Sequence, residues 1–163
     1  MQLRLADSAD APGIVEVHLR SSGAAYAALP PAVMAVSAET RRRQWIDVFE
    51  GAGSRVWVTV DGDAIAGFCH LRLLPMGIHP VAVAEIASLY IDPAYWRQGL
   101  GRRLVGAARG AAAAAGYVRL TLQVYEANTR ARVAYEALGF TAEPGTIVHA
   151  RSGLPLMICG MPL

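Results

Sequence analysis

The sequence predicts a mixed α/β domain, and three observations carry that prediction. Segments in which apolar and polar residues alternate, as in strands, are interspersed with segments in which apolar residues recur every three or four positions, as on a helix face. An apolar run at 81–91, a helical segment at 101–115 and a second run at 117–124 imply a parallel pair joined by a crossover helix. Runs nearer the N-terminus flank a two-residue turn, which implies antiparallel pairing.

Length and composition favour one domain that covers residues 1–163. No repeat or Pro/Ser linker divides the 163 residues, and 54% of them are hydrophobic against 17% charged, so the chain has apolar area for a core. No run approaches the roughly 18 apolar residues of a membrane span. The first residues lack an apolar signal core, so we expect a cytoplasmic protein with no membrane partner.

Charge and residue usage exclude several classes of site. A net charge of +2 is too mild for a concentrated nucleic-acid-binding face, so no nucleic-acid partner is expected. All 15 basic residues are arginine, which excludes lysine Schiff-base chemistry and the P-loop lysine. Cys69 and Cys159 lie in strand-like runs and are too few for a disulfide scaffold or a four-cysteine zinc site. Both are predicted core thiols, and no metal is expected.

The first third of the chain predicts a strand, two helices and a hairpin. Leu3 and Leu5 alternate with polar neighbours as in a strand. Ser8 or Asp10 can cap the first helix, which ends by Pro30-Pro31, and Ser37 opens a second that stops before Gly51. Apolar positions support both helices: Ile14, Val15, Val17 and Leu19 in the first, and Trp45, Ile46 and Phe49 in the second. Asp61-Gly62 between runs 56–60 and 64–68 is a strong hairpin signal.

The remainder predicts the crossover unit, a further helix and a closing hairpin. The helix at 101–115 is closed by Gly116, because glycine adopts the left-handed backbone that ends helices. A second helix, from Asn128 to Leu138, ends at Gly139 in the same way. Thr146–Val148 and the run 155–161 are expected to pair as a hairpin.

The segment between the apolar run 81–91 and the following helix has the features of an anion site. Gly99 and Gly101 let the backbone curl without a Cβ, and the helix start presents free N–H groups with a partial positive charge. Arg97, Arg102 and Arg103 add charge. The same two glycines can also make only a tight strand-to-helix turn, and the local pattern leaves both interpretations open.

The residue spacing excludes two known nucleotide-binding motifs. A dinucleotide fingerprint needs a glycine where Leu104 stands. The spacing of Gly101 and Gly106 fits a P-loop, but Ala107 occupies the position of its lysine.

The surrounding residues decide between the two interpretations. Ala84–Pro93, followed by Trp96 and the glycine segment, resembles the acyl-CoA motif of the GNAT superfamily of N-acyltransferases. Leu120–Val124, followed by Asn128, Ala131, Tyr135-Glu136 and Leu138–Phe140, resembles that family's second signature block. The resemblance is specific over residues 84–140 and weaker over the rest. Trp96 departs from it, since the family usually has Gln or Arg there.

The resemblance implies a fold and a cosubstrate. The fold is a mixed central sheet with antiparallel N-terminal strands, a parallel pair split around acyl-CoA and about four flanking helices. Acetyl-CoA is the expected cosubstrate, and its pantetheine arm would pair with the backbone of Leu89, Tyr90 and Ile91 as an added strand. Its pyrophosphate would rest on the segment after that strand: Arg97, Gln98, Gly99, Leu100, Gly101 and Arg102.

Asn128, Ala131 and Tyr135 complete the predicted cofactor contacts. Asn128 would be a polar contact near the cofactor arm, although Asn before a helix is also a favoured N-cap. By spacing alone Tyr135 would be core, but the resemblance makes it the general acid that protonates the departing CoA thiolate.

Glu85 is the second predicted catalytic residue. It is the only charged residue between Arg72 and Asp92, and a carboxylate in so apolar a strand is costly without a partner. It can take a proton from an amine, directly or through water. The alternative is that Glu85 points to solvent from an open face.

The acceptor is not specified by any motif. In the family the first two helices and the closing hairpin build its pocket, here residues 24–36 and 150–155, with Tyr26, Trp45 and Arg151 as candidates. His70, His79 and His149 lack metal-ligand spacing, so each is expected to be a surface or satisfied core residue. His79 and His149 could still reach the acceptor. Arg41-Arg42-Arg43 is most simply a solvated helix face, and an acidic substrate is the lesser alternative. Direct transfer makes an acyl-Cys69 step unnecessary.

These observations predict an N-acetyltransferase that transfers acetyl from acetyl-CoA to a primary amine of a small molecule or peptide in a ternary complex. A non-catalytic acyl-CoA sensor is the alternative, and Glu85 and Tyr135 argue against it. A homodimer is left open.

Overall fold

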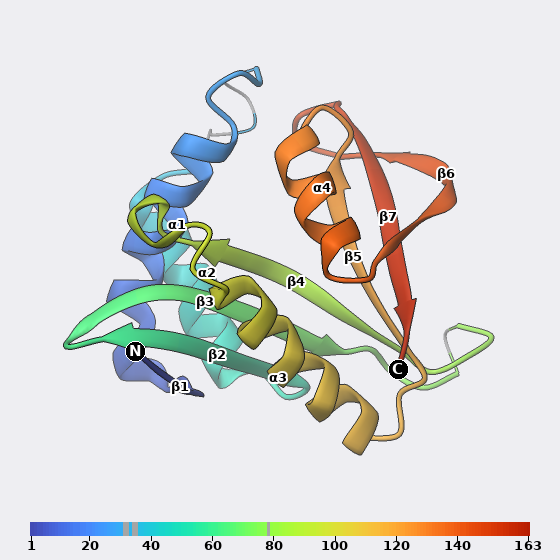
Figure 1. Ribbon diagram of the computed structural model, residues 1–163, viewed down its shortest axis with the longest axis horizontal. Coiled ribbons are helices and arrows are strands. Elements are labelled where there is room, and N and C mark those ends of the chain that lie inside the picture. Colours follow the sequence, from blue (N-terminus) through green and yellow to red (C-terminus); the bar gives the residue numbers. More distant parts are fainter. Residues whose placement is uncertain (31–32, 34–35, 78) are drawn as a thin grey trace.

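The computed structural model describes residues 1–30, 33, 36–77 and 79–163. Its central element is a seven-stranded sheet in the order β1-β2-β3-β4-β5-β7-β6 (Figure 1). Only the pairing of β4 with β5 is parallel within the described residues. The predicted α/β class and the parallel pair are confirmed.

The helices and strands follow the predicted order. The bounds are β1 (Gln2–Leu5), α1 (Ala11–Ala25), α2 (Ala38–Glu50), β2 (Ser54–Asp61), β3 (Ala64–Leu73), β4 (Val83–Ile91), α3 (Leu100–Ala114), β5 (Arg119–Tyr125), α4 (Thr129–Ala137), β6 (Thr141–Val148) and β7 (Pro155–Pro162). Two short 3-10 turns, η1 (Ser8–Asp10) and η3 (Pro93–Tyr95), precede α1 and α3.

Helices cover both faces of the sheet. On one face, α1 and α2 bury Ile14, Val17 and Trp45 against β2 and β3. On the other, α3 buries Leu104 and Ala108 against the sheet, and α4 lies on this side over β5 and β7 (Figure 1). Alternate residues of β2 and β3 therefore serve two separate cores, as the period of two in a strand requires.

Local signals at the helix ends are confirmed at most positions. The Ser37 side chain accepts a hydrogen bond from the Thr40 N–H and caps α2. Gly116 and Gly139 follow α3 and α4 with φ of 83° and 97°, the left-handed conformation that glycine adopts without strain. Cys69 and Cys159 are both buried and free, as predicted.

The N-terminal cap is assigned wrongly by the sequence. Neither Ser8 nor Asp10 caps α1 with its side chain; Asp7 instead accepts from the Ala9 N–H and caps η1. Asp10 is engaged elsewhere, because its carboxylate pairs with Arg4 at 2.7 Å. That ion pair ties the start of α1 to β1, a contact between segments that cap rules do not consider.

Two other boundaries differ from the prediction. The hairpin loop is Gly62-Asp63 rather than Asp61-Gly62, since Asp61 pairs with Ala64 and Gly62 has a φ of 59°. β6 begins at Thr141 rather than Thr146, and an irregularity between Ala142 and Thr146 interrupts its pairing with β7. The first helix ends at Ala25, and Pro31 of the predicted Pro30-Pro31 stop lies outside the described residues.

Candidate active site

The parallel strands β4 and β5 separate halfway along their length. They pair from Val83 and Arg119 to Ile86 and Leu122, after which β4 stays with β3 and β5 stays with β7. A bulge marks the point of separation, because Ser88 lies opposite His70 and Ile86 lies opposite Leu71, which leaves Ala87 unpaired. The bulge turns the end of β4 away from β5.

The backbone of β4 presents hydrogen-bonding groups to the space between the strands. The Asp92 N–H donates to the Ala66 carbonyl of β3 at 2.9 Å. Because these groups alternate along an antiparallel strand, Tyr90 also pairs with β3, whereas Leu89 and Ile91 face the other way. The Ile91 carbonyl already accepts from Ser21 Oγ and Trp96 Nε1. Of the three predicted backbone contacts, Leu89 therefore keeps both of its groups free and Tyr90 keeps neither.

The segment after β4 forms an open cradle at the start of α3. Gly99 has a φ of 79° and Arg97 a φ of 62°, the one positive φ among the described non-glycine residues. A Cβ added at Gly99 or Gly101 would meet no atom within 4 Å. The packing of the protein thus does not require a glycine at position 101, and the space beside the first N–H groups of the 15-residue α3 is open. This cradle fits the pyrophosphate of acyl-CoA.

Trp96, the departure from the family pattern, has a structural role here. Its indole Nε1 donates to the Ile91 carbonyl at 2.7 Å, which holds the cradle against the end of β4. The Arg130 guanidinium of α4 lies 3.2 Å from the centre of the Trp96 ring, in a cation–π contact. Trp96 therefore links the cradle to α4.

The predicted residues of α4 lie against the core on the cradle side of the sheet. Asn128 Oδ1 accepts from the Ala131 N–H at 3.1 Å, so its capping role is confirmed. Ala131 and Tyr135 pack against the core that α3 covers, and the ring of Tyr135 lies 6.1 Å from that of Phe140. Burial, with the nearby Tyr26 and Cys69, raises the pKa of Tyr135, and its hydroxyl has no hydrogen-bond partner among the described residues.

Glu85 lies in the paired part of β4, before the bulge. Its carboxylate accepts from Arg72 Nη2 at 2.6 Å, across the β3–β4 ladder where the two residues stand opposite each other. The side chain is 12% exposed and the partner 49% exposed. The ion pair supplies the partner that the sequence required for this carboxylate, and Glu85 is not among the residues that line the cavity described next.

A cavity of about 240 Å³ opens on the side of β4 opposite α3. We call it the acceptor cavity, after the acceptor pocket predicted from the sequence. It is lined by His18, Leu19, Ser22, Tyr26, Val33, Val36, Arg41, Ala87, Ser88, Tyr90, Gln123, Tyr125, His149 and Arg151. These come from α1, α2 and the segment between them, the separated halves of β4 and β5, and the β6–β7 loop. The cavity thus lies between the segments that the sequence predicts to build the acceptor pocket.

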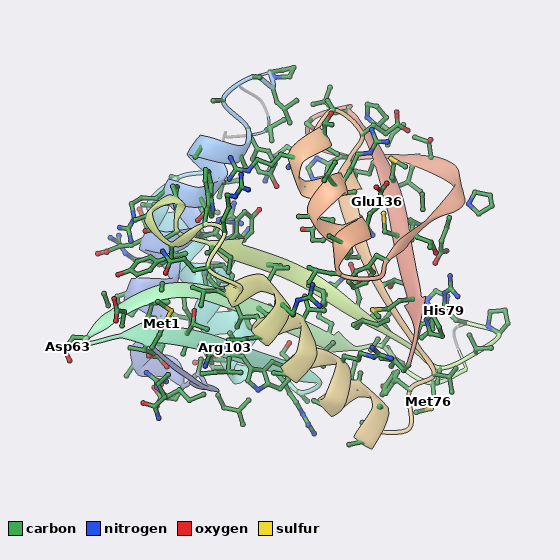
Figure 2. The ribbon with its side chains drawn as sticks, in the orientation of Figure 1. Met1, Asp63, Met76, His79, Arg103 and Glu136 are labelled. Carbon is green, nitrogen blue, oxygen red and sulfur yellow. The ribbon has the colours of Figure 1, made fainter. Side chains whose placement is uncertain are left out.

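The structure places some of the candidate acceptor residues at the cavity and others away from it. Tyr26, His149 and Arg151 line the acceptor cavity, whereas Trp45 is 3% exposed and packs in the core against Phe68. Figure 2 shows His79 on the loop after β3, at the far end of β4 from the cradle. The prediction of a solvated face is wrong for Arg41, which is half-buried and lines the cavity, while Arg42 and Arg43 are exposed.

His18 is a site residue that sequence reasoning missed. It is 5% exposed, stacks on Tyr90 with ring centres 4.3 Å apart, and its Nδ1 has no partner among the described residues. Burial, with a contribution from Arg41, lowers its pKa to about 3, so it is neutral at pH 7. The available signal was its position four residues after Ile14, on the apolar stripe of α1.

Two tyrosine hydroxyls meet at the wall of the acceptor cavity nearest the strand gap. Tyr26 Oη lies 3.2 Å from Tyr90 Oη, and Tyr26 also contacts Tyr125 edge to face. Burial raises the pKa of Tyr26 and of Tyr90, so both are neutral donors.

A mixed sheet whose single parallel pair separates beside a glycine-bearing helix start defines the GNAT fold class. The acetyltransferase (GNAT) family model matches residues 24–140, and the chain belongs to this family. The chain is 17% identical to the PaiA N-acetyltransferase from Thermoplasma acidophilum, solved with coenzyme A, with a TM-score of 0.79 over 100% of both chains. For the ribosomal-protein-S18-alanine N-acetyltransferase from Escherichia coli the TM-score is 0.73 at 20% identity, over 99% and 92% of the chains.

Two curated relatives are named mycothiol acetyltransferase. That of Beutenbergia cavernae is 37% identical over 103 residues, 63% of this chain and 32% of that protein. That of Geodermatophilus obscurus is 33% identical over 127 residues, 77% of this chain and 41% of that protein. The chain thus spans about a third to two fifths of their length.

Two features are absent from the part of the chain that the structure describes. No group of three His, Cys, Asp or Glu side chains there could hold a metal ion. No helix among the same residues is long and apolar enough to cross a membrane.

Proposed function

We propose that this chain is an N-acetyltransferase that moves an acetyl group from acetyl-CoA to a primary amine of a small molecule or peptide, by direct attack in a ternary complex. The observation that carries the proposal is the gap between β4 and β5 after Ile86 and Leu122, which has the cradle at its end and the acceptor cavity beside it. A thioester in that gap and an amine in that cavity would meet at the bulge in β4.

The cradle and β4 would hold the cosubstrate. The N–H groups from Arg97 to Arg102 would bind the pyrophosphate, with Arg97 and Arg102 exposed and without an ion-pair partner among the described residues. Leu89 would pair with the pantetheine amides as a neighbouring strand does. Acetyl-CoA supplies the activated acetyl thioester when bound.

Tyr135 is the proposed general acid. The amine nitrogen forms the C–N bond while the C–S bond breaks, and the phenol gives its proton to the sulfur. Burial raises the pKa of Tyr135, so its hydroxyl is protonated at pH 7 and available as the donor to the departing thiolate.

Glu85 is the proposed acceptor of the amine proton. Because it lies outside the acceptor cavity and is paired with Arg72, the proton would reach it through water along β4. One of the Tyr26 and Tyr90 hydroxyls donates to the other, so the pair has one hydroxyl proton left to donate to the bound acceptor or to that water.

The test is release of free CoA thiol from acetyl-CoA in the presence of diverse primary amines, with acetyl-CoA binding measured by titration calorimetry. We expect tight binding and turnover on at least one class of amine. Binding without turnover on any amine would favour the sensor alternative. No binding would contradict both.

A further inference from the structure

The acceptor cavity is positively charged and has no acidic wall. Arg41 and Arg151 line it, and none of its described lining residues is Asp or Glu. Residues 30–36, which include the undescribed positions nearby in sequence, contain no acidic residue either. A positive cavity of this kind attracts anions rather than bare ammonium groups.

In the part of the chain that the structure describes, Arg41 lacks the carboxylate partner that most of the paired arginines have. Arg4, Arg20, Arg43, Arg72 and Arg119 each pair with a carboxylate at 2.6 to 2.8 Å, and all of these are at least 37% exposed at the side chain. Arg41 has only the neutral Gln44, whose Oε1 accepts from Nη1 at 2.9 Å, and its buried Nε has no partner among the described residues.

A half-buried cation without a counter-charge is unfavourable in the protein alone. Desolvation disfavours the charge, and the nearby Arg151 adds repulsion; together they lower the pKa of Arg41. His18, whose Nδ1 has no partner among the described residues, lines the same cavity. An anion in the cavity would satisfy these groups, which the fold itself leaves without partners.

We propose that the acceptor is an amine that carries an anionic group, a carboxylate or a phosphate, and that Arg41 and Arg151 bind that group. The inference rests on the proposed function and names the substrate class of its acceptor cavity. The volume of about 240 Å³ lies below the roughly 300–1,000 Å³ of drug-sized sites, so the acceptor or its inserted part is small. The guanidinium can bind either anion through two parallel N–H groups.

The geometry gives the anionic group a positioning role. Arg41 and Arg151 line the cavity from α2 and the β6–β7 loop, whereas Ala87, Ser88 and Gln123 line it from the separated strands. An acceptor held by its anionic end on α2 and the loop would have its amine free to reach the strands and the thioester between them.

The experiment uses pairs of amines that differ in the presence of one anionic group. Suitable pairs are an α-amino acid and its carboxamide, and an aminoalkyl phosphate and the corresponding amino alcohol. Turnover is measured as CoA release, and binding by calorimetry in the presence of CoA, which does not depend on catalysis. We expect the anionic member to be preferred in kcat/KM roughly 10- to 100-fold, the value of a charge-assisted hydrogen bond.

The variants are Arg41→Gln and Arg151→Gln, with Arg42→Gln as the matched control on the same helix and outside the cavity. The first two should raise KM for the anionic amine and abolish the preference, with unchanged acetyl-CoA affinity. Arg42→Gln should keep it. Because Arg41 loses no carboxylate partner, Arg41→Gln should fold, with an unchanged or higher Tm.

Each outcome separates this inference from the function beneath it. Turnover that favours the neutral member, or a preference that survives Arg41→Gln, would overturn the anionic acceptor and leave the acetyltransferase intact. Arg41-dependent binding of anionic amines without turnover on any amine would support the anion site and contradict the proposed activity. If anionic and neutral amines bind equally to the wild type, the inference fails whatever the turnover.

Discussion

The two halves of the candidate site are built in different ways. The cradle comes from about ten consecutive residues, Asp92 to Gly101, and works through backbone N–H groups and left-handed turns. The acceptor cavity takes side chains from helices, strands and a loop far apart in the chain. A site formed by the backbone of consecutive residues can be recognised as a sequence motif, whereas a cavity assembled from side chains distant in sequence has no local signature.

Their electrostatics differ in the same sense. Within the cradle the arginines are exposed and the helix start supplies a fixed positive end. In the cavity, burial lowers the pKa of His18 and Arg41 and raises that of Tyr26 and Tyr90. The cradle therefore suits a ligand that many proteins bind, and the cavity suits a ligand specific to this protein.

The largest expected effect concerns Tyr135, which packs on the cradle side of the sheet. Tyr135→Phe should lower kcat and kcat/KM together by ~10²–10⁴-fold, because a proton donor to the thiolate is lost while the ring remains. Its hydroxyl has no partner among the described residues, so Tm should stay unchanged. Steady-state kinetics and a thermal melt on one preparation measure both.

Tyr117→Phe is the matched control for that variant. The Tyr117 hydroxyl donates to the Leu74 carbonyl at 2.8 Å, away from the site. Its loss should cost about 1 kcal/mol and lower Tm by roughly 2–4 °C with unchanged kcat. If Tyr135→Phe behaves like Tyr117→Phe, Tyr135 is a packed aromatic and not an acid.

Glu85→Gln tests whether the paired part of β4 takes part in catalysis. If Glu85 accepts the amine proton, Glu85→Gln should lower kcat by ~10²-fold or more, and the acidic limb of the pH–rate profile should disappear. Arg72→Gln is the comparison. If Glu85 only balances Arg72, both variants should keep turnover and lose at most about 1 kcal/mol, the value of a partly exposed ion pair.

Gly101→Val tests the cradle alone. A valine side chain has room in the protein but would occupy the space beside the first N–H groups of α3, so acetyl-CoA should bind at least about tenfold more weakly. Gly106→Val is the control, since its Cβ also meets no atom within 4 Å and it lies further along α3. A folded Gly101→Val with wild-type affinity by calorimetry would remove the phosphates from this position.

A further expected effect is a pH dependence of stability, to which two buried histidines contribute, His18 of the cavity and His70 of β3. His18 stays neutral in the folded protein, with a pKa of about 3 against an ordinary 6.5, so the unfolded chain binds the extra proton below pH 6.5. The free energy of unfolding should therefore fall between pH 6.5 and 3, by at most roughly 1.4 kcal/mol per pH unit from this group.

His18→Leu should flatten that slope, as measured by urea unfolding at several pH values. His79→Leu, at an exposed loop position, should leave it unchanged. Equal slopes in His18→Leu and the wild type would show that His18 is not buried in its neutral form.

The sequence by itself determined the order of strands and helices, the parallel pair, the glycine helix ends and the location of the cradle. The helix ends and the cradle depend on neighbours within about ten residues, through side-chain period, φ preference or helix-end hydrogen bonding, and the parallel pair follows from the strand–helix–strand order along the chain. The same local reasoning failed at Asp10, whose carboxylate binds Arg4 of β1 instead of capping α1.

Only the tertiary structure decided which side chains form the acceptor cavity. The Arg41-Arg42-Arg43 run is uniform in sequence, but the rotation of α2 against α1 and the sheet buries one of the three and leaves two in solvent. The same packing made Trp45 a core residue and brought His18 onto Tyr90. Such outcomes depend on the angles at which whole elements pack together, and these are set by the sum of many contacts rather than by any one segment.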